Sequence, residues 1–114
     1  MTIAVRSSPS VAVLDLAGNL TFNDGTLPLR NRVRELVDSG RRRVLLNLGG
    51  VTDMDSAGLG ELVQSYVATT RQHGQLKLLN VPRHVRQLLA ATKLATIFES
   101  FENEKAALDS FETA

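Results

Sequence analysis

Apolar and polar positions follow two different periods along the chain, and the two periods predict strands and helices. Short apolar runs bounded by turn-forming residues indicate strands at 3–5, 11–16, 43–48 and 76–81, with a last short one at 97–101. Apolar side chains recur every three or four positions in the segments 28–37, 59–70, 82–89 and 104–111, which indicates one buried helix face in each. We therefore predict an α/β sandwich, with about four helices on a mixed, mostly parallel sheet of about five strands.

Turn-forming residues set the expected connections. The first two apolar runs are separated by residues 7–10, which favours a hairpin. Gly18-Asn19 is then expected to turn the chain, and residues 21–26 to form a polar loop before the first helix. Loops at the carboxyl ends of parallel strands carry function, so the functional edge is expected to include residues 47–56 and 80–82.

The segment from Asn47 to Gly60 joins the central strand to the second helix and carries the most information. It reads Asn-Leu-Gly-Gly-Val-Thr-Asp-Met-Asp-Ser-Ala-Gly-Leu-Gly. Ser56 falls at or next to the N-cap of the helix, where its hydroxyl would lie near free backbone N–H groups. A serine in this place either caps the helix or carries an anion such as phosphate, because helix N-termini favour negative charge.

Four glycines in this segment bear on the same choice. Gly49 and Gly50 would allow a loop with positive φ. Gly58 and Gly60 lie in the first turns of the helix, where each costs about 1 kcal/mol relative to alanine. Close approach by a partner protein would explain them, and so would close packing against the strand.

Composition narrows the classes of function. A chain of 114 residues with 43% hydrophobic content is expected to form one domain over residues 1–114. A formal net charge of +1 argues against direct nucleic-acid binding. The absence of cysteine excludes disulfides and thiolate metal sites. No signal peptide and no run long enough to span a membrane are found, so we expect a cytoplasmic protein without membrane insertion.

Catalytic and cofactor sites are not supported by the spacing of the reactive residues. No lysine lies between Gly49 and Gly60, which excludes a P-loop. His73 would lie roughly 25 Å from Ser56 along one helix, too far for a catalytic pair. Asp53 and Asp55 lack a third metal ligand and are better explained as helix-capping acids. The spacing of these residues therefore argues against an enzyme and against a bound cofactor.

The run Asp55-Ser56-Ala57-Gly58-Leu59-Gly60 resembles the Asp-Ser-x-Gly-Leu-Gly signature of the STAS domain family, and the order of elements matches over nearly the whole chain. The closest resemblance is to single-domain bacterial anti-sigma factor antagonists. It implies that an anti-sigma factor serine kinase binds this domain and phosphorylates Ser56, and that a metal-dependent serine phosphatase resets it. The partner-binding residues implied are Thr21, Asp24, Asp53, Met54, Asp55, Ala57, Gly58, Leu59 and Gly60.

The chain departs from the family pattern at two positions. The family loop reads Gly-x-Leu-Asp, whereas this chain has Thr21 in place of the acid and Asp24 as the nearest substitute. Asn47 stands where the central strand usually carries an aspartate, and both changes are expected to remove negative charge near Ser56. The alternative within the family is a scaffold or accessory subunit, in a stress-signalling assembly or a membrane transport ATPase, with the same surface as a constitutive docking face.

Overall fold

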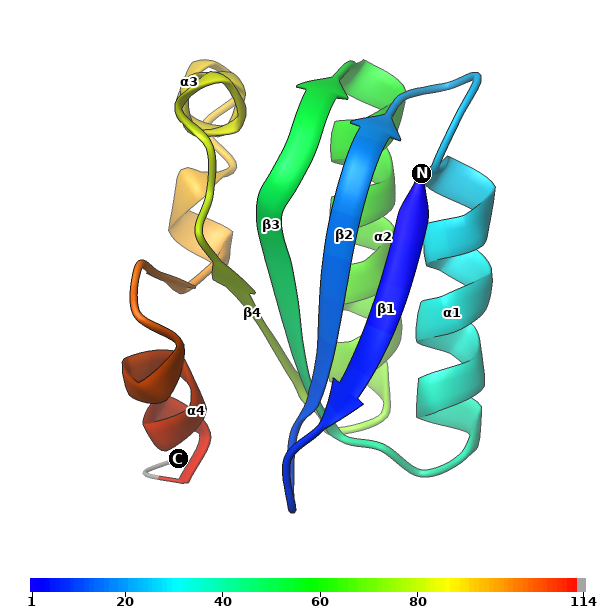
Figure 1. The fold of residues 1–114 in the computed structure, drawn as a ribbon, viewed down its shortest axis with the longest axis vertical. Coiled ribbons are helices and arrows are strands. Elements are labelled where there is room, and N and C mark those ends of the chain that lie inside the picture. Colours follow the sequence, from blue (N-terminus) through cyan, green and yellow to red (C-terminus); the bar gives the residue numbers. More distant parts are fainter. Residues whose placement is uncertain (113–114) are drawn as a thin grey trace.

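The computed structural model describes residues 1–112, so the last two residues of the predicted domain 1–114 lie outside the described residues. Figure 1 shows a central sheet with helices packed against it. The elements, in chain order, are β1 (Thr2–Ser7), β2 (Ala12–Leu20), α1 (Thr26–Asp38), β3 (Arg43–Met54), α2 (Ser56–Arg71), β4 (Gln75–Leu79), α3 (Arg83–Ala91), the 3-10 turn η1 (Ala95–Ile97), β5 (Ser100–Phe101) and α4 (Glu104–Glu112).

The sheet has the order β1-β2-β3-β4-β5, so each strand lies beside its neighbours in the chain. β1 pairs with β2 in the antiparallel sense as the predicted hairpin, and the other three pairings are parallel. The prediction of a mixed, mostly parallel sheet is confirmed. Because β2 and β3 run in parallel, their carboxyl ends meet at one edge, at the top of Figure 1.

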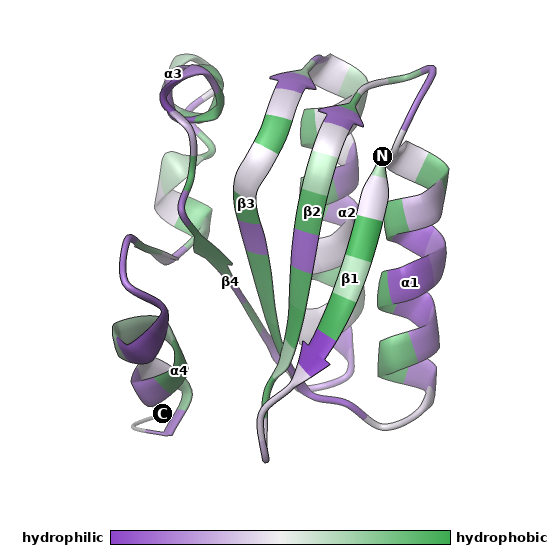
Figure 2. Cartoon of the chain, in the orientation of Figure 1, coloured by the Kyte–Doolittle hydropathy of each residue, from purple (hydrophilic) through white to green (hydrophobic). Residues whose placement is uncertain are grey.

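Each face of the sheet has its own apolar core. The larger core lies under α1, α2 and α3 and includes Leu46, Leu62 and Val85. The smaller core lies under α4 and includes Val13, Leu45 and Phe111. Figure 2 shows hydrophobic strands with a hydrophilic band across the middle of β2 and β3, and hydrophilic outer faces on the helices. The outer faces match the amphipathic pattern from which the helices were predicted.

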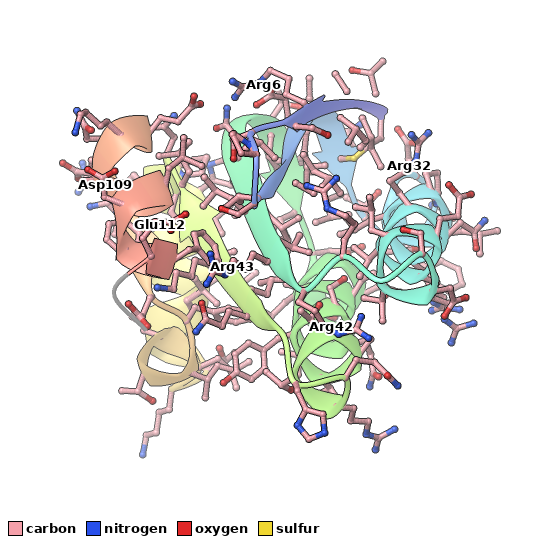
Figure 3. All side chains as sticks on the ribbon, turned by 90° about the horizontal axis from the view of Figure 1, so that it is seen from below. Arg6, Arg32, Arg42, Arg43, Asp109 and Glu112 are labelled. Carbon is pink, nitrogen blue, oxygen red and sulfur yellow. The ribbon has the colours of Figure 1, made fainter. Side chains whose placement is uncertain are left out.

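The C-terminal helix α4 is fixed to the sheet by charged as well as apolar contacts. Arg43 at the start of β3 reaches Glu112 at 3.5 Å between Nη1 and Oε1 (Figure 3). The buried Lys77 of β4 donates from Nζ to the Ser110 hydroxyl at 2.9 Å and lies 4.7 Å from the ring centroid of Phe111. Burial of this ammonium is therefore compensated by a hydrogen bond and by an aromatic face.

Both long strands continue past their predicted ends. β2 runs through Gly18-Asn19 to Leu20, so the turn predicted there is wrong, and Gly18 is accommodated with φ 104° beside an irregularity in the strand register. β3 runs through Gly49 and Gly50, which do not have positive φ. A Cβ on Gly50 would lie 2.7 Å from the Leu16 carbonyl oxygen, so this glycine serves close strand packing.

The last predicted strand is shorter than expected and begins later. Ile97 belongs to the 3-10 turn η1, and only Ser100–Phe101 pair with β4. Phe98 between them is buried and meets the ring of Tyr66 edge-on, with centroids 5.5 Å apart. The apolar residues at 97–101 are therefore explained mainly by packing of a turn against the core, and only in part by strand pairing.

Candidate functional site

The candidate site lies where β3 ends and α2 begins, beside the loop that joins β2 to α1. Asp55 is the N-cap of α2, since its Oδ1 accepts the Gly58 N–H at 2.9 Å. Ser56 is the first helical residue and lies next to the N-cap. The alternative that Ser56 itself caps the helix is wrong, because the aspartate before it holds that position.

The Ser56 side chain is exposed, and its hydroxyl has no hydrogen-bond partner within residues 1–112. The N–H groups of the first helical turn have no partner inside the helix and give its N-terminus a partial positive charge. A negatively charged group attached to this hydroxyl would therefore lie in a favourable field. The hydroxyl is free both to be modified and to be contacted by another molecule.

Asp55 also holds the neighbouring loop. Its Oδ2 accepts the backbone N–H of Phe22 at 3.0 Å, while Oδ1 binds Gly58. Hydrogen bonds from these backbone groups, that of Phe22 foremost, hold the pKa of the Asp55 carboxyl below its usual value. An ionised Asp55 thus joins the β2–α1 loop to the start of α2.

The β2–α1 loop has a defined backbone. Thr21 and Asp24 exchange backbone hydrogen bonds of 2.7 and 3.1 Å, and Gly25 follows with φ 94°. The Asp24 carboxylate accepts from the N-terminal amine of Met1 at 3.1 Å and remains 46% exposed on its side chain. The acid that the sequence suggested as a substitute therefore lies on the expected loop, with a cation already beside it.

Some of the remaining predicted partner-binding residues lie on the surface, and the others are buried beneath it. Asp53 and Gly60 are exposed, and Ala57 is half-buried. Met54, Gly58 and Leu59 are buried. A Cβ on Gly58 would collide with the carbonyl group of Leu20, whereas a Cβ on Gly60 would meet open space. Packing against the strand thus explains Gly58, and the structure gives no packing reason for Gly60.

Asn47 is not near Ser56, contrary to expectation. It lies in the middle of β3, on the order of 20 Å of strand before Met54. Its Nδ2 donates to Asp15 Oδ1 at 2.8 Å. Asp15 accepts in turn from Arg6, and that hydrogen bond lowers the pKa of the Asp15 carboxyl. The substitution at Asn47 therefore changes a polar network across the sheet and leaves the charge around Ser56 as it was.

Phe22 is the feature of this region that sequence reasoning missed. Its side chain is 77% exposed, directly beside the start of α2. An aromatic residue within an otherwise polar loop was the available signal, because turns are built mainly from Gly, Pro, Asn, Asp and Ser. Elsewhere in residues 1–112, no group of three or more His, Cys, Asp or Glu could hold a metal ion.

Comparison with known proteins shows the family to which this chain belongs. The family model of the STAS domain matches residues 2–107. The chain belongs to the STAS domain family. BtrV of Bordetella bronchiseptica, which is described as an anti-sigma factor antagonist, is 33% identical to this STAS domain over 78 residues, covering 68% of this chain and 67% of BtrV.

Solved structures share the fold of this STAS domain. A Thermotoga maritima protein described as an anti-sigma factor antagonist has a TM-score of 0.89 at 20% identity, over 96% of this chain and 94% of its own. The anti-sigma factor antagonist SpoIIAA in its unphosphorylated form has a TM-score of 0.77 at 17% identity, over 99% and 100% of the two chains. SpoIIAA of Bacillus in its phosphorylated form has a TM-score of 0.74 at 18% identity, over 96% and 99%. Among the helices described for this STAS domain, none is long and apolar enough to cross a membrane.

Proposed function

We propose that this STAS domain is an anti-sigma factor antagonist of the cytoplasm, a binding protein and not an enzyme. It binds an anti-sigma factor serine kinase through the surface around Ser56, and phosphorylation of Ser56 by that kinase dissociates the complex. A serine phosphatase then restores the binding form. One observation carries the proposal: Asp55 caps α2 and leaves the Ser56 hydroxyl exposed and unpartnered at the helix start.

The known relatives support this function. BtrV and the Thermotoga maritima protein are both described as anti-sigma factor antagonists, and the STAS family model matches residues 2–107 of this chain. SpoIIAA exists in an unphosphorylated and a phosphorylated form on the same fold. We infer that phosphorylation of this chain likewise leaves the domain folded and acts on its surface.

The charge of a phosphate on Ser56 explains how phosphorylation would dissociate the complex. A phosphate on Ser56 adds about −1.5 to −2 charges. The N-terminus of α2 tolerates this charge in the free domain because the helix dipole favours negative charge there. A partner surface that fits a small neutral hydroxyl does not, particularly with the Asp53 and Asp55 carboxylates already present. Weakening a complex a hundredfold requires only about 2.7 kcal/mol.

The proposed partner surface consists of the residues that the family signature implies. Asp53, Asp55 and Gly60 are exposed on it, with Thr21, Asp24 and Ala57 at its border. Met54, Gly58 and Leu59 hold this surface in shape from the core beneath. We propose that the exposed and border residues contact the partner directly, and that the three buried residues position α2.

Phosphorylation is tested with the purified anti-sigma factor kinase of the same organism and ATP. Wild type should gain one phosphate by intact mass, and Ser56→Ala should gain none. Thr52→Ala is the matched control, since Thr52 is an exposed hydroxyl residue four positions earlier, and this variant should be phosphorylated like wild type. A phosphate on Ser56→Ala would assign the modification to another hydroxyl and overturn the proposed switch.

Binding is tested by titration calorimetry with the same kinase. Ser56→Asp should bind at least a hundredfold more weakly, and its thermal stability should stay close to that of wild type, because the helix N-terminus accepts the added carboxylate. Equal affinities for wild type and Ser56→Asp would refute the electrostatic mechanism. A domain that binds no anti-sigma factor kinase but copurifies with transporter or stress-complex subunits would have the accessory role instead.

A further inference from the structure

The two most exposed large apolar side chains within residues 1–112 lie at the loop beside Ser56. Phe22 in this loop is 77% exposed, and Leu27, the second residue of α1, is 57% exposed. Val5 and Ile97 are the next most exposed, at 37% and 36%. A phenylalanine that stays in water contributes little to the folding of its own domain and remains available for an intermolecular contact.

The backbone that carries Phe22 is fixed before any partner arrives. Its N–H is held by Asp55 Oδ2 at 3.0 Å, and the residues on either side are joined by the Thr21–Asp24 hydrogen bonds. Gly25 closes the loop with positive φ, in a place where a Cβ would collide with the Asn19 carbonyl oxygen. An aromatic side chain on an ordered backbone loses little entropy on binding, which is the property of an anchor residue.

Phe22 and Ser56 also belong to one continuous surface, because Asp55 binds the loop through one carboxylate oxygen and the helix through the other. A stable protein interface covers about 800 Å² on each partner, which corresponds to a radius of about 16 Å. A partner centred on Ser56 therefore also covers the β2–α1 loop and the start of α1.

We propose that Phe22, with Leu27 five positions later at the start of α1, is the apolar anchor by which this STAS domain holds its anti-sigma factor kinase. The inference rests on the proposed function and names the apolar contact that contributes most to the affinity of the complex. The matching pocket on the kinase is apolar with a cationic rim, since Asp24 lies on the same loop as Phe22 and the Asp55 carboxylate binds the Phe22 backbone. In this proposal, phosphorylation of Ser56 dissociates the complex, and the Phe22 side chain increases the affinity of the unphosphorylated complex.

The experiment compares truncations of exposed apolar side chains in calorimetric titrations with the purified anti-sigma factor kinase of the same organism. Phe22→Ala should weaken binding about 30-fold, as expected for an aromatic anchor residue. Leu27→Ala should weaken binding about fivefold, and Phe22→Trp should stay within about fivefold of wild type because it keeps an aromatic ring. Ile97→Ala is the matched control, because Ile97 is an exposed apolar residue of η1, just before the edge strand β5, and its affinity should be unchanged.

The outcomes separate the anchor from the switch. Phe22→Ala should melt at the wild-type temperature, because the side chain it loses is mostly in solvent. If Phe22→Ala binds like wild type while Ser56→Asp does not bind, the anchor is refuted and the proposed function stands. If wild type itself binds no anti-sigma factor kinase, both are refuted. A loss of affinity equal in Phe22→Ala and Ile97→Ala would also refute the anchor, since it would then reflect apolar area in general.

Discussion

The two glycines of the signature helix offer a matched test of packing against function. Both lie near the N-terminus of α2, only two residues apart, yet their surroundings differ. A Cβ on Gly58 would collide with the carbonyl oxygen of Leu20 and lie 2.9 Å from its carbonyl carbon and 3.1 Å from Met54 Cγ. A Cβ on Gly60 would have no neighbour within 4 Å.

The expected effects on stability therefore have opposite signs. Alanine gains about 1 kcal/mol over glycine in a helix. At Gly58 the new carbon overlaps strand backbone that cannot rotate away, so an overpacking cost of about 3 kcal/mol is expected, leaving a net loss of about 2 kcal/mol. Gly58→Ala should thus lower Tm by roughly 8 °C. At Gly60 no overlap opposes the gain, and Gly60→Ala should raise Tm by about 4 °C.

Thermal melts followed by circular dichroism measure both changes, and titration with the anti-sigma factor kinase measures their effect on binding. If Gly60 is kept small for a partner, Gly60→Ala should bind more weakly although it is more stable. A Gly58→Ala variant as stable as wild type would show that α2 and the end of β2 are not in the close contact described. A Gly60→Ala variant that is more stable and binds equally well would remove the partner as the reason for that glycine.

Two further predictions concern the rest of the fold. Arg6 holds the pKa values of Asp15 and Glu104 below their usual values, so these pairs stabilise the fold above about pH 4, and the contribution is lost as the pH falls through the lowered values. Arg6→Gln should therefore lower the free energy of unfolding by about 0.5–1 kcal/mol at pH 7 and by less at pH 2.5 in urea titrations; an equal loss at both pH values would contradict the ion pairs. Phe111→Ala, which empties a fully buried position under α4, should cost about 3–5 kcal/mol, and a loss below 1 kcal/mol would show that α4 is not part of the folded core.

The periodicity of the sequence was sufficient for the number, type and order of the elements, because helix and strand periods depend only on which side chains face the core. It was not sufficient for the ends of β2 and β3. Both strands continue through glycine-containing irregularities at Gly18 and Gly50, where the alternation of apolar residues is interrupted although the strand pairing persists. A break in the pattern therefore predicted turns that the structure does not contain.

The candidate site could be located from the signature segment, but its internal contacts could not. Whether Asp55 or Ser56 caps α2 depends on one backbone dihedral angle, and both residue types are good caps. The hydrogen bond from the Phe22 N–H to the Asp55 carboxylate joins residues 33 positions apart, and no local sequence pattern predicts it. The place of Asn47 was misjudged for the same reason as the strand ends, since its distance from Ser56 depends on how far β3 continues.

The strands have the same order in the sheet as in the chain, and this order affects how the domain can fold during synthesis. A protein is released from the ribosome beginning at its N-terminus, and neighbours in sequence form contacts at the lowest cost of loop closure. In this chain β1, β2, α1, β3 and α2 all precede residue 72, and together they contain every group proposed to contact the kinase. The nascent chain can thus assemble the whole signalling surface while β4 is still in the ribosomal tunnel, and the later elements extend the sheet from one edge without passing through what is already folded.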